Sequence, residues 1–166
     1  MACRKRVIEA VFLSVLDYGD VIYGKAAPSV LKPLDTVYHS ALRFISGEHY
    51  RTHHCILYDR VGWPSLADRR NKHWYLFIFK VIDGTLPLYL KSLLDWNPVS
   101  YRTPSSDWLT LKVTKTNTEL GKTAFCFNAP TTWNELQNNF KICSPITYGH
   151  FKSLIVDLPT SVCNCF

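Results

Sequence analysis

The sequence predicts a mainly α-helical protein with one small β-hairpin element. Three long segments place apolar residues at helical spacing, and one later segment alternates apolar and polar residues with a period of two. A stretch rich in Pro, Ser and Asn separates the two kinds of pattern, as a surface connection would. We therefore expect a helical region over residues 1–95, a connection over residues 96–107, and a hairpin with short helices over residues 108–166.

The first predicted helix covers residues 4–16. Its apolar residues Val7, Ile8, Val11, Phe12 and Val15 recur at helical spacing and give it one buried face. The basic run before them imitates the start of a signal peptide, but Glu9 interrupts the apolar stretch and no small-residue cleavage site follows. The stretch is also too short for a bilayer, which needs about 20 residues. We expect a soluble intracellular protein, cytoplasmic or nuclear, with no membrane partner.

Two further long helices follow. The second covers residues 29–46, and Gly47 stands where a helix C-cap would. The third begins at a capping box formed by Ser65 and Asp68 and ends at Gly84. Its apolar positions are Trp74, Phe77, Ile78, Val81 and Ile82. A short helix is expected over residues 87–94.

The hairpin is predicted from two stretches with a period of two, residues 108–113 and residues 123–127. Such a hairpin is marginal by itself and needs an apolar face pressed on the helices. After it, Thr132 and Glu135 have the spacing of another capping box. A final short helix is expected over residues 148–155.

Composition sets weaker limits on function. The 166 residues carry 19 basic and 13 acidic side chains, and the resulting net charge of +6 favours a polyanionic partner without requiring one. The six cysteines are too dispersed for a small disulfide scaffold, which indicates reduced thiols.

Several motifs, in order along nearly the whole chain, resemble the region that follows the palm in reverse transcriptases of LINE-type (non-LTR) retrotransposons. These motifs are Leu16–Gly24, Ala41–Gly47, Gly62–Arg70, Phe79–Gly84 with Pro87–Leu90, and Gly121–Phe125 with Ala129 and Trp133–Leu136. The tail, Phe151–Leu154 and Cys163–Phe166, is similar to the ends of such proteins.

The resemblance implies the thumb and C-terminal region of an RNA-directed DNA polymerase without its catalytic palm. Such a region is expected to bind RNA and DNA as a template-primer duplex, mainly through phosphate groups. The family polymerises with paired aspartates that hold Mg²⁺, and this sequence has no Asp-Asp pair. We therefore expect no catalytic residue and no cofactor in this chain, with Mg²⁺ only in the missing palm. The segment from Asp17 to Asp20 is interpreted as a helix end followed by a turn.

Two predicted helices each have a basic edge, opposite their apolar face, that could bind phosphates. On the second helix the edge contains Lys32, Thr36, His39 and Arg43, and on the third it contains Arg69, Lys72, His73 and Lys80. Lys112, Lys115 and Lys122 lie on or near the predicted hairpin, where Trp108, Phe125 and Phe127 could stack on bases. The alternatives are ordinary solvated helix faces and core packing of the aromatic rings.

Other functions stay open at this point. His53-His54-Cys55 with Cys163 and Cys165 contains ligand types that suit Zn²⁺, but adjacent residues rarely ligate one ion and no Cys-x-x-Cys pair is present, so no metal site is expected. The chain could instead be a truncated remnant or a helical protein-interaction module. A salt-dependent affinity for RNA-DNA duplex would distinguish these from the nucleic-acid hypothesis.

Overall fold

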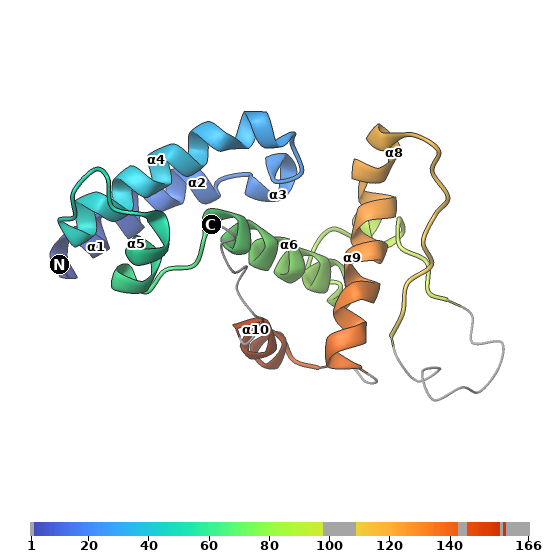
Figure 1. The fold of residues 1–166 in the computed structure, drawn as a ribbon. Helices are drawn as coiled ribbons and strands as arrows, with labels where there is room; N and C mark the ends of the chain where they lie inside the picture. Colours follow the sequence, from blue (N-terminus) through green and yellow to red (C-terminus); the bar gives the residue numbers. More distant parts are fainter. Residues whose placement is uncertain (1, 98–108, 143–145, 157, 159–166) are drawn as a thin grey trace. The chain divides into compact units, whose positions relative to one another are not determined.

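The computed structural model describes residues 2–97, 109–142, 146–156 and 158, and the protein is mainly helical (Figure 1). The described residues form two compact units, one up to His73 and the other from Trp74 to Leu158. The boundary falls inside one long helix. Most of the expected connection over residues 96–107 lies outside the described residues.

The first unit opens with a single helical stretch of three parts. These are α1 (Ala2–Val7), the π-helical segment η1 (Ile8–Leu13) and α2 (Ser14–Asp17). The helix predicted over residues 4–16 is confirmed, but its expected buried face is wrong in part. Val7, Val11 and Val15 are exposed, and Leu13 and Leu16 are buried instead. The π segment, which was not foreseen, changes the number of residues per turn and so shifts which side chains face the core. Gly19, at φ 71°, then turns the chain through the left-handed region that favours glycine, and α3 (Asp20–Tyr23) follows.

The second predicted helix is also confirmed, as α4 (Pro28–Ser46). It ends at Gly47, whose φ is 74° and whose N–H donates to the carbonyl of Arg43 at 2.8 Å. The sequence reading missed α5 (His54–Val61), which follows a short loop. Side chains of η1, α2, α4 and α5, together with Leu66 just before the third long helix, form a buried apolar cluster. It contains Leu13, Leu16, Tyr38, Leu42, Ile45, Leu57, Val61 and Leu66.

Only part of the apolar set of α4 is buried. Tyr38, Leu42 and Ile45 are almost fully buried, whereas Val30 and Val37 are exposed. The helix carries more apolar residues than one face can hold, so part of the set remains in contact with solvent.

The third predicted helix is α6 (Leu66–Asp83). The Ser65 hydroxyl accepts from the backbone N–H of Asp68 at 3.1 Å and donates to its carboxylate at 2.7 Å, which confirms the predicted start. The helix ends before Gly84, as expected, and α7 (Leu88–Lys91) is a shorter form of the helix predicted over residues 87–94.

The second unit is completed by α8 (Glu119–Thr123), α9 (Phe125–Phe140) and α10 (Tyr148–Val156), the last close to the predicted range. Its core is aromatic. The rings of Phe79 and Phe151 stack with centroids 4.4 Å apart, and the ring centroids of Trp133 and Phe151 are 5.7 Å apart. Side chains from α6, α9 and α10 therefore meet in one cluster, and the contacts between their rings stabilise it beyond the burial of apolar area.

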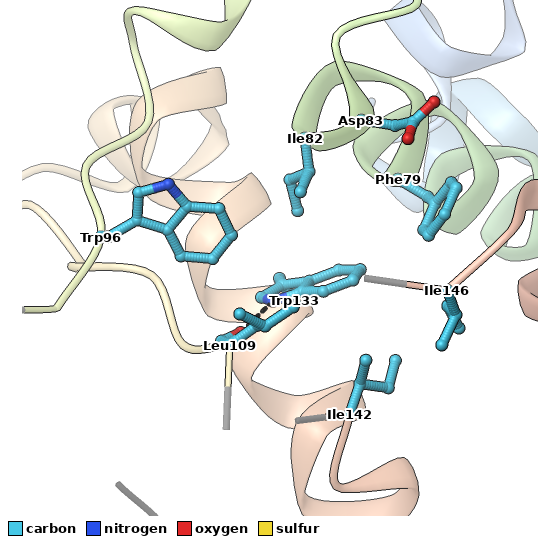
Figure 2. A pocket seen from close by; sticks show the side chains of 8 residues that line it. All are labelled: Phe79, Ile82, Asp83, Trp96, Leu109, Trp133, Ile142 and Ile146. Atoms are coloured by element: carbon cyan, nitrogen blue, oxygen red, sulfur yellow. Dashed lines mark hydrogen bonds between the residues drawn. The ribbon is translucent and has the colours of Figure 1, made fainter. Parts of the chain in front are cut away.

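A small apolar pocket of about 260 Å³ lies beside this cluster (Figure 2). The Trp133 indole N–H donates to the carbonyl of Leu109 at its wall. Asp83 is the one charged residue of its lining, which comprises Phe79, Ile82, Asp83, Trp96, Leu109, Trp133, Ile142 and Ile146.

The predicted β-hairpin is wrong. Among the described residues the β pairing consists of one isolated bridge, between Trp96 and Leu111. The side-chain amide of Asn134, in α9, binds both backbone groups of Leu111. Its oxygen accepts from the Leu111 N–H at 2.9 Å, and its nitrogen donates to the Leu111 carbonyl at 2.7 Å. Gln137 binds the carbonyl of Leu109 at 2.8 Å. Helix side chains thus satisfy the polar groups that a second strand would have satisfied.

The second expected strand is helical because a longer pattern competes with the five-residue alternation over 123–127. Phe125, Ala129, Trp133 and Leu136 recur at helical spacing, and three of them are buried. The capping box predicted at Thr132 and Glu135 is wrong for the same reason, since both residues lie in the middle of α9. Trp108, expected to begin the hairpin, lies outside the described residues.

Pro130 lies inside α9 and cannot donate a backbone hydrogen bond to Cys126. The hydroxyl of Thr114 donates to the carbonyl of Cys126 at 3.1 Å instead. The extended segment before α8 thereby supplies the missing donor and is held against the helix.

In the part of the chain that the structure describes, no helix is both long and apolar enough to cross a bilayer.

Candidate nucleic-acid interface

Four of the predicted phosphate-binding residues belong to the first unit. Lys32 is exposed near the start of α4, and Lys72 is partly exposed on α6. Arg43 is half-buried, and its guanidinium donates to the carbonyl of Thr52 at 3.3 Å while its Nε is buried without a hydrogen-bond partner. Arg43 therefore holds the loop after α4, and much of its side chain is not presented to solvent.

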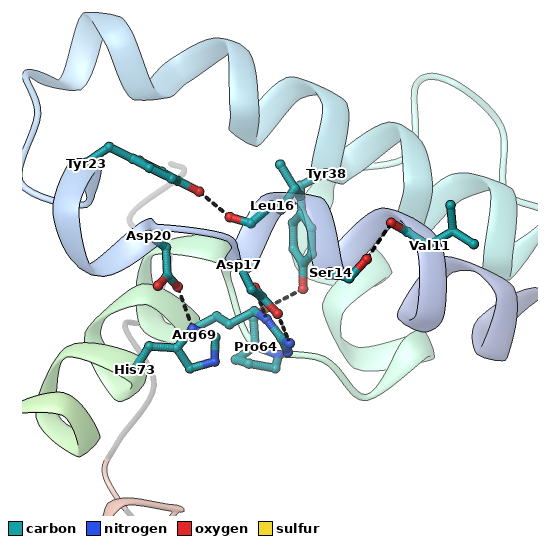
Figure 3. A network of polar contacts seen from close by, with 10 residues as sticks. All are labelled: Val11, Ser14, Leu16, Asp17, Asp20, Tyr23, Tyr38, Pro64, Arg69 and His73. Atoms are coloured by element: carbon teal, nitrogen blue, oxygen red, sulfur yellow. Dashed lines mark hydrogen bonds and ion pairs between the residues drawn. The ribbon is translucent and has the colours of Figure 1, made fainter. Parts of the chain in front are cut away.

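Arg69 is engaged in an ion pair that the helical projection did not foresee. Its Nε donates to one carboxylate oxygen of Asp17 at 2.7 Å and its Nη2 to the other (Figure 3). The hydrogen bonds to Asp17 raise the pKa of Arg69, so the guanidinium remains charged. Because two donors of the Arg69 guanidinium are already used in this pair, Arg69 is a weak candidate for a two-point phosphate contact.

Two more polar pairs join α6 to α3 and to α4. The carboxylate of Asp20, which is almost fully buried, contacts Nδ1 of His73, and the buried Arg70 donates to Asp35 at 3.4 Å. The segment between Asp17 and Asp20 is a helix end and turn, as expected, and its two carboxylates face α6 (Figure 3). The two carboxylates of this segment are thus part of a network of ion pairs that joins it to α6.

The other four predicted residues belong to the second unit. The Lys80 ammonium lies over the ring of Tyr148, 5.1 Å from its centroid. Lys122 pairs with Glu119 at 2.6 Å on the surface of α8. Lys112 and Lys115 are exposed in the extended segment. Of these four, Lys112 and Lys115 are the better candidates for phosphate contact, because Lys122 is exposed but paired with an acid.

Basic residues that the prediction did not include contact aromatic rings of the first unit. The Arg4 guanidinium lies over the Phe44 ring at 5.4 Å and donates to the Phe44 carbonyl at 3.3 Å. Lys5 donates to the carbonyl of Val61 at 2.8 Å and lies over the ring of Trp63 at 5.4 Å. Both cations thus contact the C-terminal ends of helices, where positive charge is favoured.

The loop after α4 adds a second pair of an arginine and an aromatic ring. The Arg51 guanidinium lies 5.3 Å from the Tyr50 ring centroid and donates to the Tyr50 hydroxyl at 2.8 Å. The rings of Phe44 and Tyr50 are 55% and 66% exposed. We call Arg4, Lys5, Phe44, Tyr50 and Arg51 the aromatic-basic cluster.

The sequence contains one signal for this cluster. Arg4 and Lys5 belong to the basic run that precedes the apolar residues of the first helix. The acid nearest in sequence to Tyr50, Glu48, forms an ion pair with Arg60. The positive charges of Arg4 and Arg51 are therefore left to interact with their aromatic neighbours and with solvent.

Two groups of side chains have donor atoms close enough to hold a metal ion among the described residues, Asp17 with Asp20 and His73, and His53 with His54 and Cys55. The first group is already bound in the ion pairs with Arg69 and within itself. No family model matches the chain, and comparison with curated proteins and with solved structures found no match.

Proposed function

We propose that the chain is the non-catalytic thumb and C-terminal region of a LINE-type reverse transcriptase, and that it binds template-primer nucleic acid through phosphate contacts. The ordered motifs along the sequence support the family, and the aromatic-basic cluster of the first unit supports the binding. The observation that carries the binding proposal is the pairing of Arg4 with Phe44 and of Arg51 with Tyr50 on exposed rings.

This pairing suits nucleic acid for a physical reason. A guanidinium binds a phosphate through two parallel hydrogen bonds, and an exposed ring offers a face on which a base or sugar can pack. A guanidinium that rests on a ring is pre-oriented, so it loses less conformational freedom when it binds. Neither contact reads a base edge, so binding independent of sequence is expected.

The motifs that suggest the family are also where the fold is held together. Asp17 and Arg69 come from two different motifs and form an ion pair. Trp133 and Asn134 come from a third and bind the segment around Leu111. These roles give a physical reason for such residue types to stand at these positions, which supports the resemblance.

The geometry changes which residues are proposed to contact phosphate. Lys32 and Lys72 are kept from the first unit, and Arg4 and Arg51 are added. Arg43 and Arg69 are assigned a structural role.

The test measures the affinity of the full chain for a labelled RNA-DNA hybrid by fluorescence anisotropy at several salt concentrations. Replacing Arg4 and Arg51 together by Gln should weaken binding and flatten the salt dependence by about two units, since each lost phosphate contact contributes about 0.9. Lys152→Gln, which removes a charge from an exposed position on α10, is the matched control. Unchanged affinity and slope in the double variant, with the fold intact, would contradict the proposed interface.

A second candidate, a helical protein-interaction module, is favoured by one specific observation. Five large apolar residues in the first 22 positions are between 52% and 88% exposed: Val7, Val11, Val15, Tyr18 and Ile22. Exposed apolar surface, where it is extensive, is typical of sites that contact other proteins. Absent binding to the hybrid at low salt, together with a change of association state on Val11→Glu, measured by sedimentation, would favour this candidate.

A further inference from the structure

The start of α5 brings three potential metal ligands together. One donor atom from each of His53, His54 and Cys55 lies within 4.8 Å of the other two. His53 is exposed, and the other two side chains are partly buried. Imidazole and thiolate together are the ligand types that Zn²⁺ takes in proteins, whereas Ca²⁺ and Mg²⁺ take oxygen.

Local backbone structure explains how three consecutive residues converge. His53 is the N-cap of α5, with extended backbone at φ −65° and ψ 144°, and its Nδ1 accepts from the N–H of Cys55 at 3.4 Å. His54 and Cys55 already belong to the first helical turn. The change from extended to helical backbone folds the three side chains toward one another, and the rings of His53 and His54 have centroids only 4.1 Å apart.

A second helix helps to orient the group. The His39 ring, on α4, stacks on the His54 ring with centroids 5.1 Å apart and planes at 14°. The Nε2 atom of His39 is 2.6 Å from the hydroxyl of Tyr58. Such contacts limit the rotation of an imidazole and favour one orientation of its lone pair, as partners behind metal ligands commonly do.

The charges around the group act in two directions. The first turn of a helix favours negative charge, which suits a metal-bound thiolate at Cys55. The guanidinium of Arg43 donates to the carbonyl of Thr52, the residue before His53, so its positive charge lies beside the group and would repel a bound cation.

We propose that His53, His54 and Cys55 bind one Zn²⁺ ion, with His39 as a positioning residue behind His54. Three protein ligands leave the fourth tetrahedral position to water. Binding forms a bond between zinc and the Cys55 sulfur and releases the thiol proton to solvent, so affinity rises with pH. The proposal replaces the sequence-based expectation of no metal, and it does not depend on the nucleic-acid proposal.

The site is tested by titrating the purified full-length chain with Zn²⁺ against a chromophoric chelator, and by recording the absorption spectrum with Co²⁺. We expect one bound ion and a thiolate-to-cobalt charge-transfer band. Cys55→Ser should remove the band and weaken Zn²⁺ binding at least about tenfold, because even partners behind the ligands contribute about 10 to 100-fold. Arg43→Gln should strengthen binding, because it removes a neighbouring positive charge.

The controls separate this site from other thiols. Cys3→Ser and Cys126→Ser change free cysteines elsewhere in the described chain and should leave both signals intact. The double change of Cys163 and Cys165 to Ser should also leave them intact. Loss of the band in that variant with retention in Cys55→Ser would overturn the assignment. So would a folded wild-type chain, verified by circular dichroism, that binds no Zn²⁺ at neutral pH.

Discussion

The guanidinium of Arg69 and the carboxylate of Asp17, 52 residues apart in sequence, form a two-point ion pair that joins the end of α2 to α6. Both side chains are about three-quarters buried. The pair therefore connects two segments that the local sequence pattern treats as separate helices.

Replacing Arg69 by Gln should destabilise the first unit without directly affecting a phosphate contact. Asp17 would lose its charged partner in a partly buried site, at a cost of about 1 to 3 kcal/mol. Lys72→Gln, on the same helix, should cost about 0.5 kcal/mol or less. Urea unfolding measures both. Equal stability of the two variants would mean that the ion pair contributes nothing.

Tyr38→Phe should change how stability depends on alkaline pH. Burial raises the pKa of Tyr38 above its ordinary value of 10, and burial likewise raises the pKa of Tyr58 to about 12. As pH rises, tyrosine ionises in the unfolded chain before it ionises in the folded protein, and this favours unfolding. The contribution of Tyr38 to stability is therefore complete below about pH 10 and is lost as pH rises toward the folded pKa. The variant should lose part of this dependence.

The same variant should be about 1 kcal/mol less stable at neutral pH, because the Tyr38 hydroxyl donates to the carbonyl of Pro64 at 2.8 Å. Tyr18→Phe, at a residue 86% exposed, is the matched control. Thermal unfolding between about pH 7 and pH 11 measures both effects. A wild-type stability that does not fall above about pH 10 would contradict the burial argument.

Gln137→Ala should loosen both the segment that precedes α8 and the residues that follow α9, because its side chain binds Leu109 in the first and Ile142 in the second. The Gln137 side chain is 1% exposed, and its oxygen accepts from the N–H of Ile142 at 2.7 Å while its nitrogen donates to Leu109. Removing it leaves buried backbone groups without partners, at about 1 to 3 kcal/mol. Asn138→Ala, on the exposed side of the same turn, should cost far less. Hydrogen exchange should show faster exchange at Ile142 in the first variant alone.

The chain by itself should not extend a primer on an RNA template with Mg²⁺ present. The expectation follows from the absence of an Asp-Asp pair in the sequence and from the use of Asp17 and Asp20 in ion pairs. Primer extension by the purified chain is the measurement. Activity that survives Asp17→Asn and Asp20→Asn together would point to a contaminating polymerase, whereas activity lost with them would contradict the expectation.

The long helices could be predicted from the sequence because their signals are local. Gly47 and the Ser65 hydroxyl act within a few residues of the ends that they define. The short helix α5 was missed because it buries only Leu57 and Val61, too few positions to establish a period. The hairpin was wrongly predicted because the groups that bind residues 109–111 come from side chains of α9, which a strand pattern does not contain.

The candidate site was predictable only in part. Helical projection correctly left Lys32 exposed, but it could not foresee that Arg69 pairs with an acid 52 residues away. The sequence spacing of these residues does indicate that the two pairs can meet. Asp17 and Asp20 are three residues apart and Arg69 and His73 are four apart, so each pair lies on one side of a helix or turn.

The π segment from Ile8 to Leu13 closes hydrogen bonds five residues apart, so the N-terminal helix holds one residue more than its turns require. A deletion of one residue there would convert the segment to regular α-helix and keep Leu16 in phase with the core. The same deletion in α4 would rotate every later side chain by about 100° and turn Ile45 away from the core. The N-terminal helix therefore contains a position at which the chain can change its length without exchanging its inner and outer faces.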